Sequence, residues 1–126
     1  MVRVRWNKDG TVSEASIQKA LIEYITLKGI RKYVLSIPNE SASNPIYGKK
    51  LKDLGLRKGA SDLFFAMPRR GFHGFFLELK SENGVLRPDQ REFFKDMEAM
   101  GYFTSMCRSL NSAIEITDWY CFGKEI

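Results

Sequence analysis

Two short apolar runs joined by a turn constrain the fold of this 126-residue chain more than any other feature. Residues 62–67 open with an aspartate, and residues 75–80 end in the order Leu-Glu-Leu-Lys. Side chains alternate between the two faces of a strand, so Glu78 and Lys80 lie on one face and the leucines beside them on the other. If the runs pair as a hairpin, Asp62 lies alongside that polar face. The sequence therefore predicts two acids and one lysine in a shared pocket.

This set of side chains is the minimum for metal-assisted phosphodiester hydrolysis. Asp62 and Glu78 would hold a hard divalent cation through oxygen, and Lys80 would orient or help to deprotonate the attacking water. Simpler interpretations exist, because Gly-Ala-Ser-Asp is ordinary turn chemistry and charge pairs commonly face solvent on half-exposed strands. The apolar residues 75–77 favour instead a buried strand, in which unpaired charges are costly.

Composition and charge indicate one compact domain over residues 1–126. Apolar residues make up 44% of the chain, which is typical of a globular protein rather than a disordered one. The net charge of +5 favours a polyanionic partner.

Several classes of protein are excluded by what the chain does not contain. No apolar run approaches the ~20 residues of a membrane span, and residues 1–6 lack the apolar block of a signal peptide. Cys107 and Cys121 have no metal-type spacing, so we expect them to be reduced and buried or half-buried. The sequence thus predicts a cytoplasmic protein without membrane contact.

The first half of the chain predicts a helix, a strand and a basic loop. Thr11-Val-Ser-Glu14 matches a capping box for a helix that ends at Gly29. Residues 33–37 indicate a strand that a proline stops. The polar segment 39–60 indicates mainly a loop, with room for one short helix near residues 47–54.

After the predicted hairpin come a helix, a strand and a last helix. Pro88 starts the first of these helices, which a glycine ends. Residues 102–106 indicate a strand, and residues 112–120 a helix capped by Ser109 or Asn111. The order α-β-β-β-α-β-α predicts an α/β (α+β) fold with a mixed central β-sheet flanked by helices.

Five blocks of residues, taken in order, resemble the virus-type replication-repair nuclease (VRR-NUC) domain. This family is a branch of the PD-(D/E)XK restriction-endonuclease-like superfamily, which implies a restriction-endonuclease-like fold. An Asp…Glu-x-Lys pattern alone arises by chance, whereas five ordered blocks between residues 13 and 120 are far more specific. The blocks are Glu14-Ala-Ser-Ile17-Gln18, Gly55-Leu-Arg-Lys-Gly59-Ala-Ser-Asp62, Gly74-Phe-Phe-Leu-Glu78-Leu-Lys80, Leu86-Arg-Pro88-Asp-Gln90 and Gly101-Tyr102.

The resemblance implies a role for each site residue. Asp62 and Glu78 become ligands of Mg²⁺ or Mn²⁺, and Lys80 becomes the catalytic lysine. Glu14 becomes a third catalytic acid and metal ligand that approaches from the first helix, and Gln90 a supporting catalytic residue. Helix capping alone could explain the last two, because each occupies a position where a capping side chain belongs. No small-molecule cofactor beyond the metal is implied.

Two positions depart from the family pattern. Ser61 stands where the family usually has proline, and we expect little effect because that proline shapes the backbone. Arg87 stands where a Ser or Thr cap is common, and it adds positive charge beside the site. The side chains that we expect to contact DNA phosphates are Lys49, Lys50, Lys52, Arg57, Lys58 and Arg87.

The resemblance also implies structure-selective cleavage of DNA, since stand-alone members of this type look like Holliday-junction resolvases. A four-way junction needs two symmetric cuts, so one small domain with one site would act as a C2 homodimer. A monomeric nicking or flap nuclease is an alternative. A non-catalytic nucleic-acid-binding domain on the same scaffold is another, although an abandoned site would be expected to lose Asp62, Glu78 or Lys80.

Overall fold

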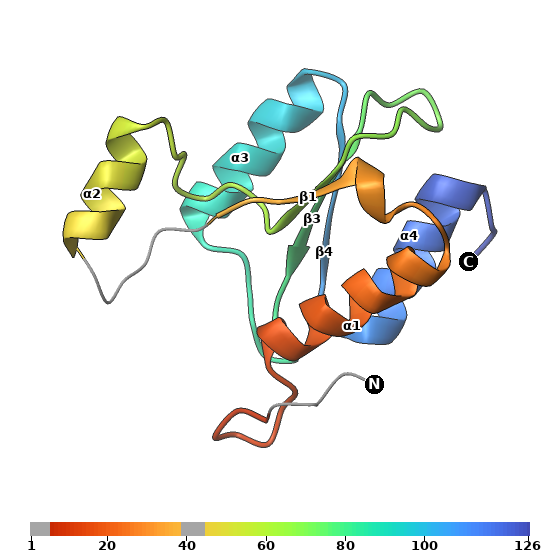
Figure 1. Cartoon of the computed structure of the whole chain (residues 1–126), viewed down its shortest axis with the longest axis horizontal. Helices are drawn as coiled ribbons and strands as arrows, with labels where there is room; N and C mark the ends of the chain where they lie inside the picture. The colour runs from red at the N-terminus through yellow and green to blue at the C-terminus, as the bar shows by residue number, and fades with distance from the viewer. Residues whose placement is uncertain (1–5, 39–44) are drawn as a thin grey trace.

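The computed structural model describes residues 6–38 and 45–126. In this part of the chain, helices cover both faces of a β-sheet (Figure 1). Helices α1 and α4 lie together on one face, α3 covers the other, and α2 stands away from the sheet. The helices are α1 (Glu14–Leu27), α2 (Pro45–Asp53), α3 (Pro88–Ala99) and α4 (Leu110–Phe122).

Within the described residues, four strands form one mixed sheet in the order β1-β2-β3-β4. The pairs β1–β2 and β2–β3 are antiparallel, whereas β3 and β4 are parallel and are joined through α3, as parallel strands require a crossover. The predicted mixed sheet flanked by helices is therefore confirmed. The strands are β1 (Val34–Ser36), β2 (Leu63–Phe65), β3 (Phe75–Leu79) and β4 (Phe103–Cys107).

The element boundaries differ from the predicted ones in a few places. A short 3₁₀-helix, η1 (Arg31–Tyr33), precedes β1, so Tyr33 is not part of the strand. The short helix allowed near residues 47–54 is present as α2. Helix α4 begins two residues earlier than predicted, and Ser109 caps it by accepting a hydrogen bond from the Ser112 N–H.

The predicted capping box at the start of α1 is wrong. Ser13 is the N-cap, and its Oγ accepts from the Ser16 N–H at 3.2 Å. The Thr11 hydroxyl instead donates to Asp9 Oδ1 at 2.6 Å and so serves the preceding turn. Glu14 is therefore the first residue of the helix, and its carboxylate is not needed for a capping box.

The main core lies between the sheet and the helix pair α1 and α4. Its buried side chains come from both helices and from alternate strand positions, and they include Ile17, Leu21, Ile25, Leu63, Phe65, Phe75, Leu77, Leu79 and Tyr120. Cys107 and Cys121 are both buried and unbridged, as expected. None of the helices in the described ranges combines the length and the apolar character needed to cross a bilayer.

The opposite face of the sheet carries an aromatic layer beneath α3. The rings of Phe64 and Phe76 stack at 4.5 Å between centroids, and Phe93 of α3 meets Phe76 edge to face at 5.1 Å. Such geometries are favourable for aromatic pairs. This layer packs α3 against the sheet, and the first turn of α3 is thereby held over the end of β3.

Candidate active site

The candidate site lies where β2 begins and β3 ends. In the antiparallel register, Leu63 faces Leu77 and Phe65 faces Phe75. Continuing this register by one residue places Asp62 opposite Glu78, on the face of the sheet that α3 covers. A hydrogen bond holds Asp62 in this position, since the Leu79 N–H donates to Asp62 Oδ2 at 2.8 Å. The hairpin therefore brings the two acids together.

Glu78 and Lys80 are both buried, although each has an ionisable side chain. Glu78 is 4% exposed and Lys80 is 8% exposed. Lys80 Nζ lies 3.7 Å from Glu78 Oε2, so the lysine partly balances the acid. The interpretation of a solvent-facing charge pair on a half-exposed strand is therefore wrong. Two ionisable groups held at this depth are costly to the fold, which is typical of a functional site.

Gln90 joins the start of α3 to this cluster through both ends of its amide. Its Oε1 accepts from the Arg87 N–H at 2.9 Å, which caps the first turn of the helix. Its Nε2 donates to Glu78 Oε2 at 3.1 Å, in a buried position. Helix capping and support of the site are thus one arrangement, because the capping bond turns the amide nitrogen toward the carboxylate.

Burial and like charge dominate the electrostatics of the site. Burial is the main cause that raises the pKa of Glu78 to about 8, the negative charge of Asp62 adds to it, and Lys80 opposes it. The Glu78 carboxyl group therefore keeps a proton at neutral pH when nothing else neutralises the pair. Desolvation also raises the pKa of Glu14, with a smaller contribution from Asp62.

Glu14 lies at the edge of the site rather than in its centre. It is exposed in the first turn of α1, yet it is within the electrostatic influence of Lys80, Asp62 and Arg87. Among the residues that the structure describes, no three His, Cys, Asp or Glu side chains are close enough to hold a metal ion. The structure thus unites Asp62 with Glu78 but does not assemble the predicted group of three acids.

The donor set nevertheless suits a divalent cation. Two adjacent carboxyl groups repel each other when both are ionised, and here burial and repulsion retain a proton on Glu78. A hard cation bound through oxygen would replace that proton and neutralise the pair. Asp62 and Glu78 would hold the cation, and Glu14 of α1 is a further acid within their electrostatic influence.

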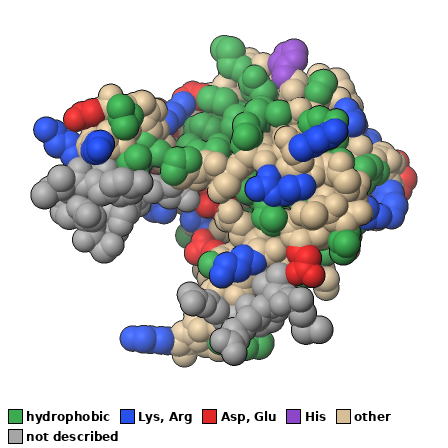
Figure 2. All heavy atoms as spheres, viewed as in Figure 1, with side chains coloured by type: hydrophobic (Ala, Val, Ile, Leu, Met, Phe, Trp, Pro, Cys, Tyr) green, Lys and Arg blue, Asp and Glu red, His purple; other side chains and the backbone are tan. Residues whose placement is uncertain are grey.

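The six basic residues predicted to bind DNA do not lie in one place. Three of them, on or near α2, form part of a lobe that stands off the main body (Figure 2). Arg57 instead binds Asp96 of α3 at 2.6 Å and lies over the ring of Phe93. Arg87 pairs with Asp89 at the start of α3 and is thereby beside the site. The exposed members on α2 are Lys49, Lys50 and Lys52, and Lys58 is also exposed.

Gly59 anchors the segment that leads to Asp62 against the start of α3. Its φ is +91°, and a Cβ at this position would lie 2.5 Å from the Asp89 carbonyl oxygen. Both the backbone conformation and the close approach require glycine. Ser61, a buried residue two positions later, makes no hydrogen bond through its Oγ within the described part of the chain. The Ser61 hydroxyl, at the position where the family usually has proline, thus adds no hydrogen bond to the site.

The Gly59→Ala variant is expected to lose on the order of 3 kcal/mol of unfolding free energy, because strain and overlap add. Gly55→Ala is the matched control, since Gly55 has φ +104° but no atom within 4 Å of an added Cβ. The control should lose about 1 kcal/mol from backbone strain alone. Urea unfolding measures both. Equal losses would mean that the contact with Asp89 is relieved by a local shift.

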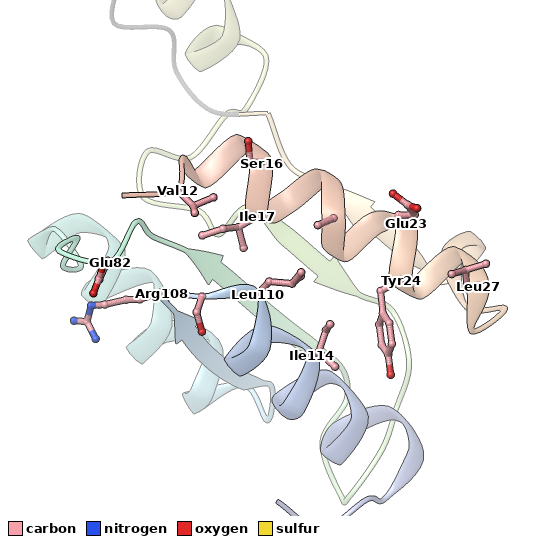
Figure 3. A pocket seen from close by; sticks show the side chains of 12 residues that line it. Val12, Ser16, Ile17, Glu23, Tyr24, Leu27, Glu82, Arg108, Leu110 and Ile114 are labelled. Atoms are coloured by element: carbon pink, nitrogen blue, oxygen red, sulfur yellow. The ribbon is translucent and has the colours of Figure 1, made fainter. Parts of the chain in front are cut away.

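An apolar groove of about 880 Å³ runs between α1 and α4, on the face of the sheet opposite α3 (Figure 3). Apolar side chains such as Ile17 and Leu110 form most of its lining, and Glu82 and Arg108 lie at one end. None of the proposed catalytic side chains lines it. The groove is therefore separate from the site at the end of β3.

Two residues near the site were missed in the sequence. Gly84 packs against the Lys80 side chain, and Arg108 donates a hydrogen bond to the Gly84 carbonyl. The Asn-Gly pair at 83–84 is a common turn signal and could have indicated the turn. Nothing in the sequence indicates that the turn rests on Lys80 or that a residue 24 positions later holds it.

Comparisons with known proteins agree with this fold. The model of the VRR-NUC domain family matches residues 12–111, a range that includes every proposed catalytic residue. A solved structure described as a VRR-NUC domain protein superposes with a TM-score of 0.76 over 87% of this chain and 88% of that chain. The two sequences are 21% identical, so this likeness shows the fold alone. No curated protein sequence matches this chain significantly. The chain belongs to the VRR-NUC domain family and has its nuclease-type fold.

Proposed function

We propose that this protein is a Mg²⁺- or Mn²⁺-dependent endonuclease that cleaves branched DNA, with the four-way junction as its substrate. One observation carries the proposal: the half-buried Asp62 and the buried Glu78 lie side by side, Gln90 donates a hydrogen bond to Glu78, and the Lys80 ammonium group lies 3.7 Å from Glu78 Oε2. A buried acid beside a second acid destabilises a protein and is therefore difficult to explain without a cation to neutralise the pair. Family membership supports the choice of a nuclease.

The positions of the residues support the following roles. Asp62 and Glu78 would hold the cation, and Glu14 would approach it from the first turn of α1. When bound, the metal supplies polarisation of the scissile phosphate and activation of a water molecule. Lys80 orients that water and offsets the negative charge that develops on the phosphate. Gln90 keeps the Glu78 carboxylate in one orientation. No covalent intermediate with the protein is needed.

The basic residues supply phosphate contacts away from the reacting centre. Arg87 stands beside the site at the start of α3, where the helix N-terminus also favours an anion. The α2 lysines would contact a DNA arm further from the cut. Arg57 would contribute less, because its ion pair with Asp96 and its contact with Phe93 already hold it against α3.

Cleavage of a four-way junction on two symmetric strands requires two sites, so the proposal includes a homodimer. A monomeric nicking or flap nuclease is the alternative that retains the same chemistry. A sizing column with and without junction DNA separates the two. Elution as a monomer in both conditions would reject the symmetric two-cut model.

The test of the proposed function is cleavage of an immobile four-way DNA junction in a gel assay, with duplex and 5′-flap controls. We expect paired symmetric cuts in Mg²⁺ or Mn²⁺ and none in EDTA, because Asp62 and Glu78 need a cation to act. Cuts confined to the flap or the duplex would keep the nuclease and reject the junction. Binding without cleavage would support the non-catalytic alternative.

A further inference from the structure

The chain turns back on itself directly after Lys80, and this turn rests on the lysine. The Gly84 N–H donates to the Ser81 carbonyl at 2.9 Å, which closes the turn. A Cβ on residue 84 would lie 2.8 Å from Lys80 Cβ and 3.3 Å from Lys80 Cδ. Non-bonded carbons pack at about 3.5–4.0 Å, so only a glycine leaves room here for the lysine stem. The Gly84 backbone therefore covers the aliphatic part of Lys80.

Arg108 holds this turn from the neighbouring strand. It follows β4, whose last residue, Cys107, accepts a hydrogen bond from the Lys80 N–H at 2.9 Å. Arg108 Nε donates to the Gly84 carbonyl at 2.7 Å. In the close view, the Arg108 side chain extends from the strand end toward the segment that carries Glu82 (Figure 3). The turn is thus fixed at its start by the backbone of Lys80 and at its end by the guanidinium.

We infer that Gly84 and Arg108 are positioning residues that hold Lys80 in one rotamer, an inference that rests on the nuclease function proposed above. A free lysine side chain has many rotamers, and ordering it during the reaction would raise the barrier. The turn covers the stem in advance, which leaves the ammonium group next to the Glu78 carboxyl group. The two residues touch neither metal nor DNA in this role and act through Lys80.

The first test measures the exposure of Lys80 and does not depend on nuclease activity. Acetylation with acetic anhydride, read by mass spectrometry, compares Lys80 with the exposed Lys19. The Gly84→Ala and Arg108→Met variants should each raise the relative labelling of Lys80 severalfold, because the cover over its stem is displaced. If Gly84→Ala does not fold, Arg108→Met carries the test alone.

Arg31→Met is the matched control for the arginine. Arg31 Nη1 also donates to a backbone carbonyl, that of Val34, at 2.7 Å, but it lies at the far end of the sheet. Loss of this contact should leave the labelling of Lys80 unchanged. Unchanged labelling in Arg108→Met itself would overturn the inference.

The second test separates catalysis from DNA binding. In Arg108→Met, kcat for junction cleavage should fall by about 10- to 100-fold, as expected for a misplaced catalytic group, while KM stays constant. Arg108→Lys should recover part of kcat, because a lysine can still donate to the Gly84 carbonyl. A higher KM with unchanged labelling would make Arg108 a DNA contact and overturn the positioning role. If the labelling of Lys80 rises in Arg108→Met but the wild-type protein cleaves no DNA, the positioning role of Gly84 and Arg108 is retained and the nuclease function is rejected.

Discussion

Replacing Lys80 with methionine is expected to reduce DNA cleavage by on the order of 100- to 1,000-fold while DNA binding is retained. Methionine keeps an apolar stem beneath Gly84 and removes the ammonium group that lies 3.7 Å from Glu78. The proposed phosphate contacts lie elsewhere, on α2 and at the start of α3, so affinity should not depend on Lys80. Cleavage is measured in a gel assay, and binding by fluorescence anisotropy with the divalent metal withheld.

The control is Lys19→Met, which removes one exposed positive charge from α1 and leaves the site intact. This variant should cleave like the wild type. A parallel loss of binding and cleavage in Lys80→Met would indicate a structural role for the lysine. Retained cleavage would remove Lys80 from the catalytic set.

Replacing Glu78 with glutamine is expected to abolish cleavage and to remove a pH dependence of stability. The pKa of Glu78 is raised to about 8 in the folded protein, mainly by burial, from its ordinary value of 4.5. Between these two pH values, the folded state keeps a proton that the unfolded state has lost. The contribution of Glu78 to the unfolding free energy of the metal-free protein should therefore be greatest below pH 4.5 and decrease as the pH rises to about 8, by up to about 1.4 kcal/mol per pH unit.

Glutamine does not titrate, so the Glu78→Gln protein should lack this decline. Urea unfolding in EDTA at several pH values between 5 and 9 measures the slopes. Glu92→Gln, an exposed position on α3, is the control and should keep the wild-type slope. Equal slopes in wild type and Glu78→Gln would show that the Glu78 carboxyl group is ionised in the folded protein. Mg²⁺ should stabilise the wild type more at pH 8 than at pH 6, because it competes with the proton.

The centre of the site could be predicted from the sequence because it depends on local rules. Strand alternation places Glu78 and Lys80 on one face, and a hairpin between two apolar runs places Asp62 beside them. The same rules predicted the mixed sheet and its helices. The family resemblance added Gln90, whose bond to Glu78 is present.

The remainder depends on contacts between distant parts of the chain. Arg57 lies in a basic segment and was therefore predicted to contact DNA, but it forms an ion pair with Asp96, 39 positions later. The distance of Glu14 from the other acids depends on how α1 packs, which no local pattern encodes. Such choices are fixed by tertiary structure alone.

Because Gln90 makes two hydrogen bonds, the geometry of the site depends on whether the first turn of α3 is folded. One amide satisfies the helix start and restrains Glu78, so fraying of the first turn also releases the carboxylate. Local opening of a helix end needs less free energy than unfolding of the whole protein. Mild denaturant should therefore disorder the first turn of α3 before the sheet, and the protein would lose the arrangement of the Glu78 carboxyl group while most of its structure persisted.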